Sequence, residues 1–210
     1  MNRLVLAICS VTFLAACPNP ADKAQKAQVG ETKAAVEKPA EEAKPTKAMA
    51  LALDPAKSSV GFVGSKVTGN HEGGFDKVTG TIHLVEGIVG SRAAITIDMT
   101  SVKSDSDKLT GHLRSPDFFD VEKFPTAKFR IIEMKKVEGD RYKVAGELDL
   151  HGVTKGIVFE ATITADDAAV RAKSEFSINR KDFGIVYAGK PDDLIRDDVL
   201  IKLDVVAPKS

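Results

Sequence analysis

Histidines, cysteines and closely spaced carboxylates are the residues of this 210-residue chain that could do chemistry. The histidines lack the close pairing that zinc sites use. They are His71, His83, His112 and His151. Asp105 and Asp107 begin a sequence like a calcium loop, but Leu109 stands where an oxygen ligand is needed. No nucleophile elbow or triad spacing accompanies the serines. We therefore predict no metal, no cofactor and no catalytic residue, and we expect a protein that is not an enzyme.

One cysteine, in contrast, stands where a covalent modification is expected. Met1–Arg3 is a short positive start, and an apolar run follows from Leu4 to Phe13. A run of this length is typical of an export signal rather than of a permanent membrane span. Leu14–Ala15–Ala16–Cys17 resembles the lipobox of bacterial lipoproteins, which implies removal of residues 1–16 and acylation of Cys17. The alternative is an ordinary secretory signal that contains a cysteine by chance.

The charge balance argues against nucleic acid as a partner, and the composition sets residues 17–52 apart from the rest of the chain. The 30 Lys and Arg balance the 30 Asp and Glu, so the attraction that supplies most non-specific affinity for nucleic acid is missing. Residues 17–52 consist mainly of Ala, Lys, Glu and Pro, which predicts a flexible tether behind the acylated cysteine. A partner-binding helix is the alternative, but the segment has no apolar stripe. The oligomeric state is left open.

Residues 53–207 alternate apolar and polar side chains, which predicts half-buried strands. Eight strands are expected, near 58–67, 75–85, 91–99, 126–134, 141–150, 156–164, 170–179 and 198–206. Turn-like connections between them favour antiparallel pairing, and Ile131–Ile132 interrupts the alternation as a bulge would. Ser104–Arg114 predicts one short capped helix. The fold class is therefore all-β, an eight-stranded antiparallel barrel with a short helical insertion between strands 3 and 4.

Small side chains at inward positions of these strands bear on whether the barrel is hollow. They are Gly64, Gly80, Gly146, Ala161, Ala172 and Ser174. Glycines also relieve strain where barrel strands bend, which is the alternative explanation. Bending does not require alanine or serine, so we expect a hollow lumen with apolar walls and a long apolar ligand. A lipid-facing outer-membrane barrel is disfavoured, because the chain has no Trp and only two Tyr for interfacial girdles.

Four sequence blocks carry a resemblance to a known family. They are GHLRSPDFFDVEKFP (111–125), GELDLHGVTKGIVF (146–159), FSINRKDFGI (176–185) and DDVLIKLDVVA (197–207). In this order they resemble the signature blocks of the YceI-like, lipocalin-like family. The resemblance implies a barrel that binds a polyisoprenoid or another amphiphile, for example a quinone or a polyprenyl chain. Many members have a Lys-His pair in the first strand, where this chain has Ser65–Lys66–Val67.

The predicted ligand-binding residues combine inward strand positions with positions carried over from the blocks to the lumen and its mouth. They are Phe62, Gly80, Ile82, Leu84, Ile95, Ile97, Leu109, His112, Leu113, Phe118, Phe119, Phe129, Gly146, Leu148, Phe159, Ala161, Phe176, Ile178, Phe183 and Tyr187. We favour a hydrogen-bonded His112 that fixes the helix to the barrel rim. Arg180 and Asp182 are expected to form a structural ion pair, and the acidic 192–198 loop a solvated turn.

These observations predict a lipid-anchored protein that faces the periplasm of a bacterial cell envelope. It would hold a long-chain isoprenoid or another amphiphilic lipid in its lumen and touch the membrane, inner or outer, through the acylated Cys17. One alternative is an accessory to isoprenoid or quinone redox chemistry, for which His112 and Tyr187 are the candidate polar groups. The other is a structural or stress-protective envelope protein without a dedicated ligand.

Overall fold

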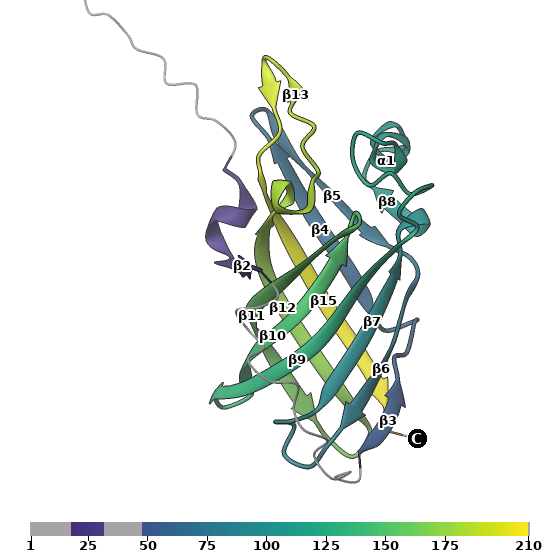
Figure 1. Cartoon of the computed structure of the whole chain (residues 1–210), viewed down its shortest axis with the longest axis vertical. Coiled ribbons are helices and arrows are strands. Elements are labelled where there is room, and N and C mark those ends of the chain that lie inside the picture. Colours follow the sequence, from purple (N-terminus) through teal and green to yellow (C-terminus); the bar gives the residue numbers. More distant parts are fainter. Residues whose placement is uncertain (1–17, 32–47, 210) are drawn as a thin grey trace, which may run out of the picture.

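The computed structural model describes residues 18–31 and 48–209 (Figure 1). The predicted signal (1–16), Cys17 and residues 32–47 lie outside the described residues. The strands are β1 (Gln25–Lys26), β2 (Gln28–Gly30), β3 (Met49–Ala52), β4 (Ser59–Lys66), β5 (Gly69–Phe75), β6 (Val78–Leu84), β7 (Arg92–Asp98), β8 (Val102–Ser104), β9 (Thr126–Glu138), β10 (Arg141–Leu150), β11 (Val153–Ala165), β12 (Ala169–Asn179), β13 (Gly189–Lys190), β14 (Asp193–Leu194) and β15 (Asp198–Pro208). The helices are η1 (Pro20–Lys23), η3 (Met99–Ser101), α1 (Asp107–Arg114) and η4 (Arg180–Phe183).

The strands form one long curled sheet, which confirms the all-β, lipocalin-like fold (Figure 1). The order along the sheet is β3-β6-β7-β9-β10-β11-β12-β15-β4-β5-β8, and neighbours on this path are antiparallel. Each of the eight expected strands is present, and α1 lies between β7 and β9 with Ser106 as its N-cap. Five further strands, β1, β2, β3, β5 and β8, bring the sheet to thirteen within the described residues.

Two local features of the sheet follow from the sequence. The register of β9 against β10 shifts opposite Gly146, so Ile132 is the extra residue of the predicted bulge. His151 and Gly152 both adopt positive φ, at 54° and 74°, and join β10 to β11 by the two-residue turn whose twist suits a hairpin. The bulge and the turn fix the inward face of both strands.

The barrel shape arises where one chain segment changes its partners. β7 pairs with β6 and β9, whereas β8, which follows after the three residues of η3, pairs with β5. Because β5 lies near one end of the sheet order and β7 near the other, this switch brings the two ends together. No ladder joins β3 to β8 within the described ranges, so the wall is a half-barrel rather than a closed ring of hydrogen bonds.

The N-terminal segment fills a split in the wall. β11 and β12 pair only at their turn, from Thr162↔Lys173 to Ala165↔Val170. Beyond it, β2 pairs with β11 and β1 pairs with β12. The Gln25 side chain stands at the fork: its Nε2 donates to the carbonyls of Glu160 (2.7 Å) and Glu175 (3.3 Å), and its Oε1 accepts from the Glu160 amide (2.8 Å). Gln25 thus replaces the ladder bonds that the diverging strands lose.

Apolar and polar contacts hold the same segment in place. Ala27 is buried in the main core, and Ala21 packs with Val63 and Leu200. The Asn19 side chain caps η1 and accepts a hydrogen bond from Ser65 Oγ at 2.8 Å. The prediction of a flexible tether is therefore wrong for residues 18–31, and it also missed β3. Alanines are small enough to fit in the seam, and the exposed backbones of β11 and β12 supply the pairing.

The hydrophobic core extends along the inside of the barrel. Its main cluster contains Val78, Val144, Ile157 and Val205, each almost fully buried, from strands around the whole wall. A second cluster around Phe62, Val102 and Leu113 lies under α1. Among the described residues no helix is long and apolar enough to cross a bilayer.

Candidate functional site

Apolar chambers remain inside the barrel core. One cavity has a volume of about 180 Å³, and we call it the upper chamber. A second cavity of about 60 Å³ adjoins it, and we call this one the lower chamber. An engineered protein cavity of about 150 Å³ binds benzene, so the upper chamber admits a ring or a short branched chain as it stands. A longer chain needs the side chains between the chambers to move.

Phenylalanine rings separate the two chambers. Phe129 and Phe159 line both of them, as do Ile95 and Leu203. The Phe159 ring stacks on Phe176 at a centroid distance of 4.2 Å, and Phe129 lies 5.7 Å from Phe159. Phenylalanine has no polar group to satisfy, so these rings can change rotamer without breaking hydrogen bonds. We call Phe129, Phe159 and Phe176 the waist.

Most of the predicted ligand-binding residues line these chambers. Those on the upper chamber are Phe62, Ile95, Ile97, Leu113, Phe118, Phe119, Phe129, Leu148, Phe159, Phe176 and Ile178. Ile82, Leu84 and Ala161 line the lower chamber. Six predicted residues line neither chamber: Gly80, Leu109, His112, Gly146, Phe183 and Tyr187. Phe183 is fully buried in the core, and Leu109 and Tyr187 pack on the outer side of the cluster under α1.

Gly80 and Gly146 do not create lumen volume, so this part of the sequence interpretation is wrong. A Cβ at Gly80 would lie 2.5 Å from the Ala94 carbonyl oxygen. A Cβ at Gly146 would lie 2.5 Å from both the Arg130 carbonyl oxygen and the Phe129 ring. Neighbouring groups therefore occupy this space. Gly64 differs, because it lines the upper chamber and nothing lies within 4 Å of its Cβ position.

An aromatic group covers the chamber beside α1. His112 packs edge-on against Phe118 and Tyr187, with centroid distances of 4.9 and 5.0 Å. The Nε2 atom of His112 lies 2.8 Å from Asp117 Oδ2, in the segment after the helix. The hydrogen bond therefore joins the helix to the segment that follows it rather than to a barrel strand, and the His112 ring lines neither chamber.

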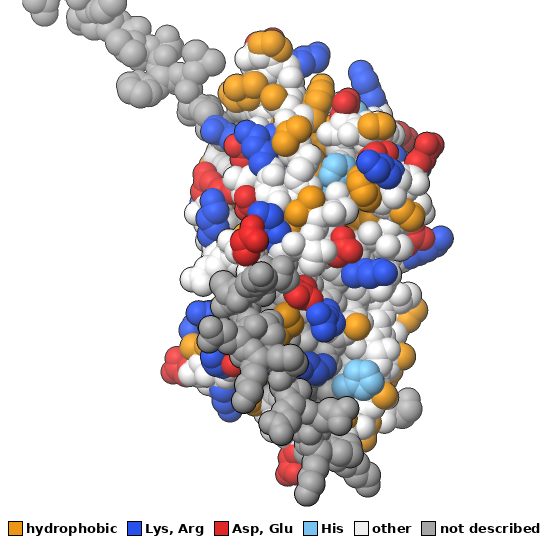
Figure 2. Space-filling view, in the orientation of Figure 1, with side chains coloured by type: hydrophobic (Ala, Val, Ile, Leu, Met, Phe, Trp, Pro, Cys, Tyr) orange, Lys and Arg blue, Asp and Glu red, His pale blue; other side chains and the backbone are white. Residues whose placement is uncertain are grey.

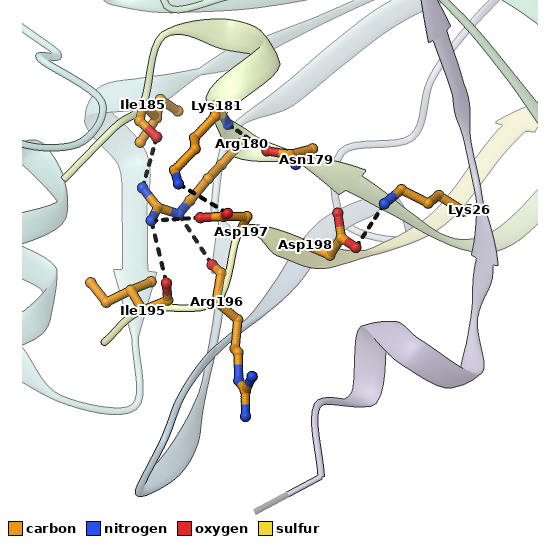
Figure 3. Close-up of polar contacts among 9 residues, drawn as sticks. All are labelled: Lys26, Asn179, Arg180, Lys181, Ile185, Ile195, Arg196, Asp197 and Asp198. Atoms are coloured by element: carbon orange, nitrogen blue, oxygen red, sulfur yellow. Dashed lines mark hydrogen bonds and ion pairs between the residues drawn. The ribbon is translucent and has the colours of Figure 1, made fainter. Parts of the chain in front are cut away.

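Arg180 is a charged residue on the wall of the upper chamber, a position that the sequence pattern did not predict for it. The residue is 5% exposed. Its guanidinium donates to the carbonyls of Ile185 (2.7 Å), Arg196 (3.1 Å) and Ile195 (3.4 Å), as Figure 3 shows. Burial lowers the pKa of this group, and the negative charge of Asp197 opposes that shift. Arg180 therefore ties both ends of the 184–197 loop to the barrel.

The ion partner of Arg180 differs from the predicted one. It is Asp197, at 3.3 Å, rather than Asp182. Pairing of β12 with β15 places Asn179 opposite Asp198, which brings the two residues together. Asp197 also pairs with Lys181 at 3.0 Å, and Asp198 pairs with Lys26 of the N-terminal segment at 2.8 Å (Figure 3). The acidic loop is therefore cross-linked by cations rather than simply solvated.

Replacing Arg180 by methionine is expected to destabilise the fold and release the loop. The change leaves three carbonyls without a donor, and we expect the free energy of unfolding to fall by about 3 kcal/mol. Chemical denaturation measures the stability, and limited proteolysis measures cleavage within residues 184–197. Lys181→Met is the matched control, because this exposed side chain shares the same Asp197 partner. Equal losses in the two variants would contradict the role assigned to Arg180.

Other polar clusters of the described residues offer no comparable site. No group of three or more His, Cys, Asp or Glu side chains there could hold a metal ion. A wide hollow of about 940 Å³ lies on the outer face of β4, β5, β12 and β15. Its lining includes Lys103, Asp105, Lys173, Lys202 and Asp204, so it suits water rather than an apolar chain.

Comparison with known proteins decides the family. Residues 51–207 match the YceI-like domain. The chain belongs to the YceI-like family. A UPF0312 protein of Photorhabdus laumondii is 35% identical over 57% of this chain and 64% of its own length. The YceI protein of Escherichia coli is 39% identical over 43% of this chain and 50% of its own length. The chain thus spans between half and two thirds of these YceI-like relatives.

Solved structures show the same YceI-like fold. The crystal structure of BcnA from Burkholderia cenocepacia has a TM-score of 0.69 and is 25% identical, covering 74% of this chain and 99% of BcnA. A polyisoprenoid binding domain from Saccharophagus degradans has a TM-score of 0.64 and is 20% identical, covering 77% and 99% of the two chains. These similarities confirm the fold that the resemblance of the four sequence blocks implies.

Proposed function

We propose that this protein holds an isoprenoid-type lipid in its barrel lumen, as a carrier or a store in the bacterial cell envelope. The upper chamber carries the proposal, because its walls are apolar except at Arg180. The Saccharophagus degradans protein of the same fold is described as a polyisoprenoid binding domain, which supports this class of ligand. Branched, flexible isoprene units suit a narrow space lined by Phe and Ile side chains.

The proposal includes attachment to the membrane through an acylated Cys17 and a location facing the periplasm. Its support is the sequence of the first seventeen residues. Several acyl chains on one residue give stable anchoring, which a single chain does not. The protein would therefore act where isoprenoid lipids are made and used.

The lumen must widen for a long chain to enter. The two chambers together offer about 240 Å³, the sum of about 180 and about 60 Å³. Movement of the waist residues would join them into one channel. The candidate polar groups for redox chemistry, His112 and Tyr187, line neither chamber, so we propose binding rather than catalysis.

Mass spectrometry of lipid extracted from the purified full-length protein tests this function. We expect an isoprenoid lipid in a fixed ratio to protein, near one molecule per chain. Free membrane lipids that merely accompany the anchor would appear in proportion to the detergent and membrane content instead. A protein that carries no such stoichiometric lipid after expression in its natural host would contradict the proposal.

A further inference from the structure

The mouth end of the barrel carries the β4–β5 turn, α1 and the 184–197 loop, which contains β13 and β14 (Figure 1). We propose that this end docks directly on the surface of a lipid bilayer, so that the lumen opens toward the membrane. The inference rests on the acyl anchor of the proposed function and adds the orientation of the barrel. Four features of the described residues support it.

The first feature is the place where the chain meets the barrel. The Pro18 carbonyl accepts a hydrogen bond from Asn70 Nδ2 (3.4 Å), and Asn70 belongs to the β4–β5 hairpin. The next residue, Asn19, is buried and bonded to Ser65 and Asp198. Consecutive Cα atoms are about 3.8 Å apart, so an acyl group on Cys17 would start beside the mouth end. The described part of the chain is thus attached to the barrel from its first residues, Pro18 and Asn19.

The second feature is exposed apolar surface at the same end. Val186 is 64% exposed, Leu194 49% and Val67 37%, and these are three of the six exposed large apolar side chains among the described residues. The Val67 amide donates to the Leu194 carbonyl at 3.2 Å, so these two residues are adjacent. Figure 2 shows apolar side chains gathered at the top of the molecule, over the end that carries β13. Large apolar side chains in water are unfavourable, and a bilayer would cover them.

The third feature is the position of this surface over the chamber. Ile185 and Ile195 line the upper chamber, and each is next in sequence to one of the exposed residues, Val186 and Leu194. A lipid that leaves the chamber past these residues would reach the bilayer without exposing its apolar chain to water. The proposed orientation therefore serves lipid exchange.

The fourth feature is the charge of the loop. The 184–197 loop contains two basic side chains, Lys190 and Arg196, and three acidic ones, Asp192, Asp193 and Asp197, of which Asp197 pairs with Arg180 and Lys181 of the barrel. Asp193 is already paired with Lys66 at 2.6 Å. The loop thus neither attracts nor repels a charged membrane strongly, and docking should change little between low and high salt.

Two single-cysteine variants of the acylated protein test the orientation. Val186→Cys places a nitrobenzoxadiazole dye at the mouth end. Val137→Cys places it beside the β9–β10 turn at the other end, where the valine is 46% exposed. The chain has two cysteines, Cys9 in the predicted signal and Cys17, whose thiol is blocked when acylated. Vesicles of phosphatidylethanolamine and phosphatidylglycerol then carry a nitroxide-labelled lipid as quencher.

We expect the fluorescence emission of the dye at position 186 to shift to shorter wavelength when the protein binds vesicles. The nitroxide lipid should quench this emission at least threefold more strongly than that of the dye at position 137. Leu194→Cys should behave as Val186→Cys and covers a failure of either variant to fold. Equal weak quenching at both ends, in protein that floats with the vesicles, would refute the orientation alone. If the mass of the protein shows no acyl chains and the protein does not float with the vesicles, the anchor is refuted, and the orientation is refuted with it. Lipid extracted from the lumen is a separate measurement, so the carrier function is judged independently.

Discussion

Replacing Gly64 by leucine is expected to reduce lipid binding in the lumen roughly 100-fold while the protein stays folded. Gly64 lines the upper chamber, and nothing lies within 4 Å of its Cβ position. Its backbone is not in the left-handed region, so a side chain is tolerated. Four added carbons displace about four ligand CH₂ groups at about 0.8 kcal/mol each, which is the basis of the 100-fold loss.

Lipid extraction and mass spectrometry measure this effect, and circular dichroism with thermal unfolding reports the fold. Gly111→Leu is the matched control, since Gly111 also has open space but lies on the exposed face of α1, away from both chambers. The Gly111→Leu control should bind as much lipid per protein molecule as the unchanged protein does. Normal loading of Gly64→Leu would show that the bound lipid does not occupy the upper chamber.

Replacing Ala27 by aspartate is expected to detach the N-terminal segment from the seam between β11 and β12. Ala27 is buried in the core, and a carboxylate there has no cation to pair with among the core residues. The segment would leave rather than bury the charge, so the loss is limited to its docking free energy. We expect about 3 kcal/mol, or roughly a 10 °C lower Tm for a protein of this size.

Hydrogen exchange locates the change. The amides of residues 156–158, which face β2, and those of residues 176–177, which face β1, should lose protection. Gln28→Asp introduces the same charge one residue further on, at an exposed position, and should leave protection unchanged. Retained protection in the Ala27→Asp variant would mean that β1 and β2 do not depend on burial of this alanine.

The sequence predicted the elements whose cause is local. Alternation of apolar residues located the eight long strands, because each has one face in the core. The capping residue Ser106 located α1, and two adjacent isoleucines located the bulge in β9. The parity of the strand positions also predicted residues that line the chambers, and most of the predicted ligand-binding residues lie there.

Features that depend on contacts between distant segments could not be predicted from the sequence. β5 contains Gly73 and Gly74, so it shows no alternation, and β1 and β2 have no apolar stripe. Their existence depends on the edges that other strands leave unpaired. Gly80 and Gly146 suggested free space, but the carbonyls of the neighbouring strands fill it. The position of Arg180 on the chamber wall follows from the pairing of β12 with β15.

The seam filled by the N-terminal segment also orders the events of folding. Gln25 bonds to Glu160, 135 residues further along the chain. Such a contact closes a very long loop, which is slow compared with forming the neighbouring hairpins. β1 and β2 are synthesised before β11 and β12. They cannot take their place in the wall until β11 and β12 have formed. We expect the wall to be completed last at this seam, which leaves a temporary side entrance while the rest of the barrel is already formed.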